Sequence, residues 1–167
     1  MSQKGRSSDD LERRIRHWLA GARSVVVAGV GNPLRRDDSV GIHIVRQLKR
    51  VLVSEKVHVV ECETVPENYL GYIEGFKPSH ILLIDAVDAG LEPGGLVLTH
   101  PSEIRGLVLS SHNIPLSVFS EYLDRTTGAR VALLGIQPER VEFGEDLTAR
   151  VRDAACAITE ILVQVLS

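Results

Sequence analysis

The chain contains little cysteine and no long apolar run. Its only cysteines are Cys62 and Cys156, which lie far apart and form no Cys-x-x-Cys motif. A disulfide framework and a structural zinc site are therefore excluded, and a reducing cytoplasm fits this composition. No apolar stretch approaches the about 18 residues that a membrane-spanning helix needs, so no membrane partner is expected. Because the first ten residues are polar, we also expect no signal peptide.

An excess of positive charge is lacking as well. The 19 Lys and Arg residues and 22 Asp and Glu residues give a net charge of −3 at pH 7, and both signs are interspersed. Without a basic stripe, nucleic acid is not an expected partner. The chain is 44% hydrophobic, which is far too apolar for intrinsic disorder. Its 167 residues predict one domain that buries a substantial core.

Continuous apolar runs of strand length alternate with stretches of helical periodicity. Strands are expected near residues 24–30, 57–62, 81–84, 96–98 and 131–136, and helices near 8–21, 40–52, 66–76, 115–123 and 151–165. Ser8 is the expected cap of the first helix and Gly21 its end. Residues 1–23 thus form an N-terminal extension with a helix, and residues 24–167 form a single α/β domain. The alternation predicts a three-layer α/β/α architecture around a twisted, mostly parallel sheet of about five strands.

In such a sheet the active site lies beyond the carboxyl ends of the strands, so the residues directly after each strand are the candidates. After the first strand, Gly29-Val30-Gly31 imitates the start of the dinucleotide-binding motif Gly-x-Gly-x-x-Gly, but Leu34 replaces the third glycine. Asp37 and Asp38 then occupy the expected helix start, where a phosphate would need positive potential. Each aspartate is either a helix cap or a functional carboxylate.

Further candidates follow the later strands. Asp85 ends an apolar run, a common position for a functional carboxylate in an α/β sheet. Asp88 better fits the alternative, a turn that leads into Gly90. His112 lies in a polar loop before a helix and has no evident structural role. Asp85 and His112 are therefore retained beside the acidic pair.

Other catalytic patterns are missing. The chain has no His-Glu-x-x-His pair, no Gly-x-Ser-x-Gly elbow and no Walker loop. Both cysteines are expected in the core rather than as nucleophiles, because one falls in a strand and the other on an apolar helix face. Two carboxylates and an imidazole at one sheet edge could hold zinc or nickel with coordination positions left open. The two carboxylates could instead share a proton and activate water. Spacing leaves both possibilities open.

Five short segments occur in order between residue 25 and the last helix. They are Gly29-Val30-Gly31-Asn32 with Asp37, Asp38 and Gly41; Val65-Pro66-Glu67-Asn68; Leu83-Ile84-Asp85-Ala86 with Asp88-Ala89-Gly90; Ser111-His112-Asn113-Ile114-Pro115-Leu116; and Leu134-Gly135-Ile136-Gln137-Pro138. Together they resemble the endopeptidases that mature the large subunit of nickel–iron (NiFe) hydrogenases. The resemblance is closest to the branch that serves formate-hydrogenlyase-type and archaeal hydrogenases.

The resemblance implies a site and a substrate. In this family a nickel-contacting triad consists of the second residue of the acidic pair, an aspartate after the third strand and a histidine in the later loop. These positions are Asp38, Asp85 and His112 here. The implied activity is that of a cytoplasmic endopeptidase of aspartic or metal-assisted type. It recognises nickel already inserted in the hydrogenase large-subunit precursor and removes a C-terminal extension after a Cys-x-x-Cys-x-x-His/Arg motif. Nickel is thus expected to be carried by the substrate rather than bound permanently.

The chain also departs from the family, and alternatives stay open. Ser39 stands where the family often has glycine, and residues 1–23 lie outside the match. A second hypothesis is a non-catalytic chaperone that holds nickel-loaded precursor without cutting it. A third is a nucleotide-binding enzyme that uses Gly29 and Gly31, against which the missing third glycine argues. Whether the metal or a carboxylate polarises the water is left open by the sequence.

Overall fold

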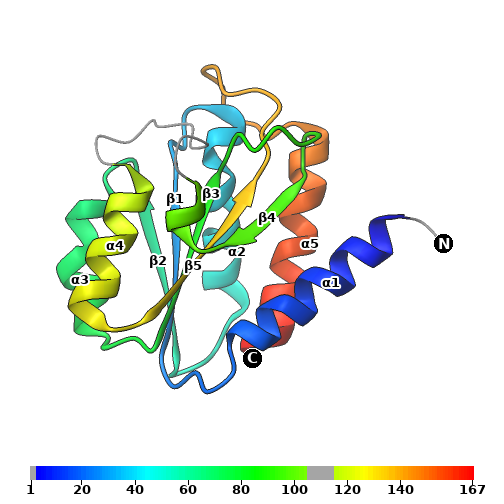
Figure 1. Ribbon diagram of the computed structural model, residues 1–167. Coiled ribbons are helices and arrows are strands. Elements are labelled where there is room, and N and C mark those ends of the chain that lie inside the picture. The colour runs from blue at the N-terminus through cyan, green and yellow to red at the C-terminus, as the bar shows by residue number, and fades with distance from the viewer. Residues whose placement is uncertain (1–2, 105–114) are drawn as a thin grey trace.

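A five-stranded sheet forms the centre of the protein (Figure 1). The computed structural model describes residues 3–104 and 115–167. The strands are β1 (Val25–Val30), β2 (Val57–Glu63), β3 (His80–Ala86), β4 (Leu96–Thr99) and β5 (Arg130–Ile136). They lie in the order β2-β1-β3-β5-β4, and only the edge strand β4 is antiparallel to its neighbour among these strands. The predicted twisted, mostly parallel sheet is confirmed.

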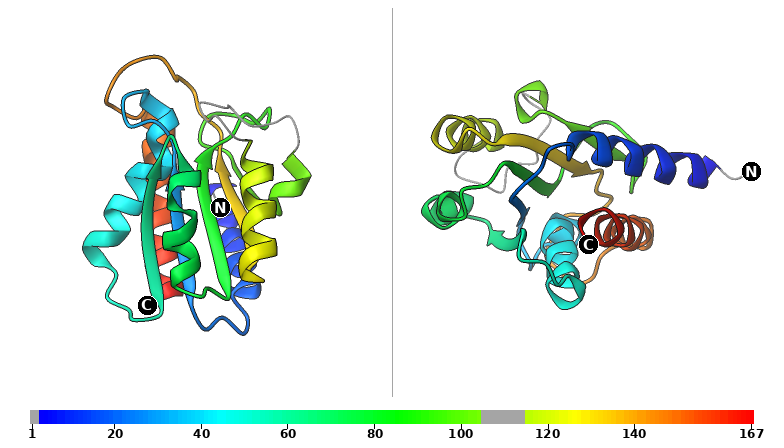
Figure 2. Two further views of the ribbon diagram at one scale, coloured as in Figure 1. Left: turned by 90° about the vertical axis from the view of Figure 1, so that its left-hand side faces the viewer. Right: turned by 90° about the horizontal axis from the view of Figure 1, so that it is seen from below.

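Helices cover both faces of the sheet (Figure 2). The α-helices are α1 (Gln3–Trp18), α2 (Val40–Val51), α3 (Leu70–Gly75), α4 (Leu116–Thr127) and α5 (Ala149–Leu166), and the 3-10 helices are η1 (Arg36–Ser39), η2 (Pro66–Tyr69) and η3 (Pro101–Ile104). The helices α1, α2 and α5 pack on one face, and α3 and α4 pack on the other. This is the predicted α/β/α arrangement. No helix within the described ranges is long and apolar enough to cross a membrane.

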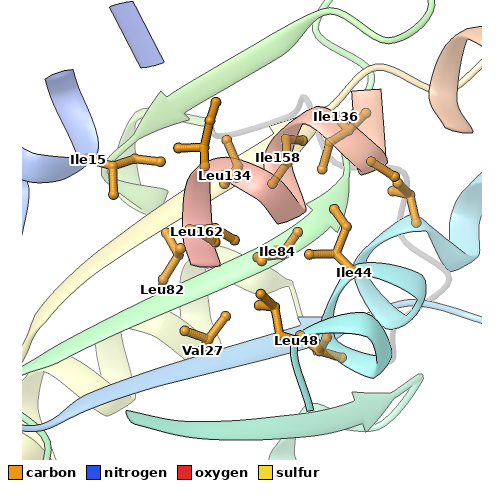
Figure 3. Packing of buried hydrophobic residues seen from close by; sticks show 14 of the residues in the cluster. Ile15, Val27, Ile44, Leu48, Leu82, Ile84, Leu134, Ile136, Ile158 and Leu162 are labelled. Carbon is orange, nitrogen blue, oxygen red and sulfur yellow. The ribbon is translucent and has the colours of Figure 1, made fainter. Parts of the chain in front are cut away.

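The apolar runs of the sequence build a core on each face of the sheet. Every residue of β1 and β3 is buried, as expected for strands covered on both faces. On the face seen in Figure 3, Val27, Leu82 and Ile84 belong to one apolar cluster with Ile44 and Leu48 of α2. Intervening strand residues point the other way, toward α3 and α4. A strand with two buried faces therefore shows a continuous apolar run instead of alternation.

The first helix differs from its expected bounds. It begins at Gln3, before the predicted cap Ser8, and ends at Trp18. Leu11 and Ile15 are buried in the core beside α5, so the apolar stripe does place the helix on the domain. No proline precedes this stripe to stop the helix, and a polar residue such as Ser8 can lie inside it. The stripe therefore located the helix but not its first residue.

The two cysteines lie in different environments. Cys62 in β2 is buried as predicted, and burial raises the pKa of its thiol to about 12. Cys156 is exposed, so the prediction that it belongs to the core is wrong. The buried stripe of α5 passes through Val151, Ala155 and Ile158. Position 156 follows Ala155 by one residue and therefore lies about 100° further round the helix.

This difference predicts the reactivity of the thiols. In the native protein at about pH 8, one thiol should react with a chromogenic disulfide reagent, because only an accessible thiolate attacks. Unfolding in denaturant should release the second. The variant Cys156→Ala should show no fast-reacting thiol when native, whereas equal rates for both thiols in the native protein would contradict the buried position of Cys62.

Candidate functional site

Loops from three strands meet at the carboxyl edge of the sheet. Because β1, β3 and β5 are parallel neighbours, the segments that follow them leave the sheet at the same end. In Figure 1 this is the upper end, where η1 and the start of α2 lie beside residues 137–148. The backbone N–H of Arg36 in η1 donates to the carbonyl of Gly144 at 2.8 Å, which joins the first and third of these loops. Residues remote in sequence are thereby placed close together.

Asp38 and Asp85 are both buried at this edge. Asp85 is the penultimate residue of β3 and is 0% exposed, and Asp38 lies in η1 and is 3% exposed. The two elements that carry them, η1 and β3, are in direct contact. The carboxylate of Asp85 accepts a hydrogen bond from the N–H of Ala86 at 2.8 Å. The structure thus brings two of the three sequence-predicted site residues to the same end of the sheet.

Two glycines allow η1 and α2 to approach the strands so closely. A Cβ atom on Gly41 would lie 2.2 Å from the carbonyl oxygen of Ile84, the residue before Asp85. A Cβ atom on Gly31, whose φ is +146°, would lie 2.0 Å from the carbonyl oxygen of Asp38. A side chain at either position would push the backbone segments apart. Gly31, which imitates a phosphate-binding glycine in the sequence, therefore serves the close packing of η1.

Asp37 does not cap a helix, so that alternative is wrong for it. No side-chain cap bond is found at the start of η1 or of α2 within the described residues. The carboxylate of Asp37 is 0% exposed and accepts bonds from the segment after β5 instead. The N–H groups of Glu139 and Arg140 each donate to it at 2.9 Å. The N–H and the hydroxyl of Thr148 donate at 2.8 and 2.7 Å.

The turn after β3 is also held by a residue that follows β5. Asp88 forms the predicted turn, since its Oδ1 accepts the N–H of Gly90 at 3.3 Å. The side-chain oxygen of Gln137 accepts the N–H groups of Ala89 at 2.8 Å and Leu91 at 3.2 Å. The Nε2 of Gln137 donates to Asp88 at 3.3 Å. These bonds fix the path of the chain where it leaves β3.

His112, the third predicted site residue, lies outside the described residues. Between residues 3 and 104 and from residue 115 onward, no three His, Cys, Asp or Glu side chains are grouped so that they could hold a metal ion. The described chain resumes just before α4, which begins at Leu116. Because α4 leads through Gly128 to the amino end of β5, its first turn lies at the carboxyl edge of the sheet (Figure 1).

The buried carboxylates determine which chemistry this edge can perform. Two neighbouring carboxyl groups can share a proton, so that one acts as a base and the other as an acid toward water. They can also contribute oxygen ligands to a divalent metal ion. The fold and the two buried carboxylates are typical of α/β enzymes, whose active sites lie beyond the carboxyl ends of parallel strands.

Comparison with known sequences identifies the family. The sequence profile of HycI, the hydrogenase maturation protease, matches residues 42–165. The Hydrogenase 3 maturation protease of Escherichia coli K12 is 32% identical over 130 residues, which cover 77% of this chain and 82% of that protein. The chain therefore belongs to the hydrogenase maturation protease family, which confirms the resemblance seen in its five segments.

Solved structures of related proteins share most of the fold. The crystal structure of the NiFe hydrogenase maturation protease HycI from Thermococcus kodakarensis has a TM-score of 0.85 at 28% identity, and the match covers 92% of this chain and 98% of that one. The solution structure of the endopeptidase HycI from E. coli has a TM-score of 0.77 at 28% identity, covering 86% and 92%. The match to the T. kodakarensis protein thus extends over most of this chain.

Two residues that organise this edge were not assigned their roles by sequence reasoning. The sequence predicts either a cap or a functional carboxylate for Asp37, and it marks Gln137 only as part of a family segment. The one available signal was their position, since each lies just beyond a strand or next to a candidate carboxylate. Their partners come from other loops, and no local pattern identifies such partners.

Proposed function

We propose that the protein is an endopeptidase that removes a C-terminal extension from the large-subunit precursor of a NiFe hydrogenase after nickel insertion. The observation that carries this proposal is the buried pair Asp38 and Asp85 at the carboxyl edge of a chain in the hydrogenase maturation protease family. Buried carboxylates supply the acid and base groups that hydrolysis of a peptide bond needs.

Asp38, Asp85 and His112 form the proposed reacting set. When the precursor docks, these side chains contact its nickel and orient a water molecule next to the scissile carbonyl. A carboxylate accepts a proton from the water as the oxygen attacks, and the protonated group returns a proton to the leaving nitrogen. The nickel is cargo of the substrate and adds positive charge near the reacting bond.

The placement of α4 supports the inclusion of His112. By strand alternation, Asp85 points to the same face as Ile81 and Leu83, and α4 covers that face. The first residue of α4, Leu116, follows His112 by four positions, which an extended chain spans in at most about 14 Å. A histidine four residues before α4 can therefore approach the same end of the sheet as Asp38 and Asp85.

Cleavage of a defined precursor tests the proposed function. Purified protein is incubated with nickel-loaded and with nickel-free large-subunit precursor, and intact mass is measured for each. We expect the nickel-loaded precursor alone to lose the mass of its C-terminal extension. A precursor that already lacks the extension serves as the control and should not change. A stable complex without any loss of mass would instead identify a chaperone that binds the precursor.

The isolated protein is expected to hold little metal. Two carboxylates and one imidazole, without a thiolate, make a poor permanent site, because tight structural sites use four ligands with soft or imidazole donors. Metal analysis after dialysis against a mild chelator should therefore find much less than one metal ion per chain, and calorimetry should show weak nickel binding. A stoichiometric metal that survives dialysis would contradict nickel delivery by the substrate.

A further inference from the structure

We propose that Asp37 is the positioning residue of this site. Its carboxylate fastens the segment 137–148 onto η1 and so holds Asp38 beside β3. We call the four hydrogen bonds that Asp37 accepts from this segment the Asp37 brace. The effect on cleavage rate rests on the proposed function, whereas the effect on η1 does not.

The Asp37 brace joins parts of the chain that are distant in sequence. Its donors lie between 102 and 111 residues after Asp37. The backbone of Asp37 takes part as well, because its N–H donates to the carbonyl of Arg140 at 3.0 Å. Both the main chain and the side chain of one residue in η1 are thus bound to the segment after β5.

Further backbone bonds next to Asp37 belong to the same junction. Gly144 accepts the N–H of Arg36 at 2.8 Å and donates its own N–H to Leu34 at 2.9 Å. Arg36 has a φ of +38°, which is unfavourable for a residue with a side chain. Such a conformation persists when the surrounding bonds hold it in place. The junction with residues 137–148 supplies those bonds.

Asp38 depends on this junction because η1 is a weak element by itself. η1 has four residues, and short 3-10 turns have poor hydrogen-bond geometry. The sheet supports it on one side through its contact with β3, and the Asp37 brace supports it on the other. Without the Asp37 brace, η1 keeps its contact with β3 and the backbone bonds to Arg140 and Gly144, but it loses the four buried bonds to the Asp37 carboxylate. The Asp38 carboxylate would then sample positions away from β3.

The charge and the shape of Asp37 are both needed. A carboxylate has two acceptor oxygens, which together accommodate four donors. Asparagine offers one acceptor oxygen and places an NH₂ group against N–H donors, so buried donors lose their partners. The change Asp37→Asn therefore removes part of the Asp37 brace without changing the size of the side chain. Thr148→Val removes only the hydroxyl bond, and Thr148→Ser keeps it.

The test compares these three variants with a matched control. Thr159→Val removes a threonine hydroxyl that donates to the carbonyl of Ala155 within α5, 11 residues beyond Thr148 (159 − 148), and takes no part in the Asp37 brace. Amide hydrogen exchange is measured for residues 35–41 and 137–148, and kcat and KM are measured on nickel-loaded precursor below the unfolding temperature. The exchange measurement needs no substrate. It therefore tests the Asp37 brace even if the wild-type protein does not cleave the precursor and the proposed function is wrong.

We expect Asp37→Asn to speed amide exchange about tenfold or more in both segments, the scale of a lost bond to a charged group, while sheet amides stay protected. Its kcat should fall about 100-fold, as for a misplaced catalytic group, with little change in KM. Thr148→Val should show the same pattern with smaller changes, and Thr148→Ser and Thr159→Val should behave like the wild type.

Two results would overturn the proposal. One is faster amide exchange confined to residues 137–148, with the exchange of η1 unchanged. This would show that the Asp37 brace stabilises only the segment after β5. The other is an unchanged kcat in a folded Asp37→Asn or Thr148→Val protein whose wild type is active. If Asp37→Asn does not fold, Thr148→Val decides between these outcomes.

Discussion

Asp85→Asn is expected to reduce processing of nickel-loaded precursor at least about 100-fold, the scale of losing a positioned catalytic group. Asparagine keeps the shape of the side chain and the oxygen that accepts the N–H of Ala86, but it loses the charge and the ability to accept a proton. Asp38→Asn should have a similar effect. Initial rates of precursor cleavage, followed by intact mass, measure both.

The stability of these variants separates a catalytic from a structural role. Asp38→Asn and Asp85→Asn should each change the free energy of unfolding by only about 1–2 kcal/mol, the order of one lost polar interaction. Asp124→Asn is a suitable control, because Asp124 is an exposed carboxylate in the C-terminal half of α4. It should leave the cleavage rate unchanged. If both site variants unfold under assay conditions, the two carboxylates are structural and the proposed reacting set is wrong.

Gly41→Ala should strongly destabilise the fold. Alanine normally favours a helix over glycine, but here its Cβ would lie 2.2 Å from the carbonyl oxygen of Ile84 and 2.7 Å from that of Val30. Both contacts are with backbone in central strands, which cannot move aside cheaply. We expect a loss of about 3 kcal/mol or more, at the upper end for overpacking. Chemical denaturation measures the change.

Gly71→Ala is the matched control for this substitution. Gly71 lies in α3, and apart from its chain neighbours and the backbone of its own helix, no atom lies within 4 Å of where its Cβ would be. Alanine should therefore stabilise the protein slightly, by up to about 1 kcal/mol. A Gly41→Ala protein as stable as the wild type would show that α2 does not need its close approach to β1 and β3.

The strands and most helices could be predicted from the sequence because their signals are local. The run before Asp85 is apolar at every position, and β3 is buried on both faces. The periodicity that begins at Val40 matches α2, which buries that stripe. The periodicity did not predict features that depend on a single position, namely the first residue of α1 and the exposure of Cys156. An apolar stripe shows which face of a helix is buried, but not where the helix begins or which residues at the border of that face are exposed.

The candidacy of Asp38 and Asp85 also followed from the sequence. Alternating strands and helices imply parallel strands, and parallel strands end at one edge, so carboxylates just beyond two strands must share that edge. The structure agrees, with both side chains buried and their elements in contact. His112 stays a prediction. Its proposed place rests on the family segment that contains it and on the start of α4.

Only the tertiary structure decided what Asp37 does. The family resemblance selects Asp38 for the site but gives Asp37 no role, and a helix cap is a reasonable alternative for either residue. Its four donors come from a segment more than 100 residues away, and none of them forms a pattern with an acidic pair. The same holds for Gly41. That this position has no room for a side chain becomes evident only when the strand containing Ile84 is packed against it. Local periodicity encodes the elements, whereas contacts between loops depend on how the elements are assembled.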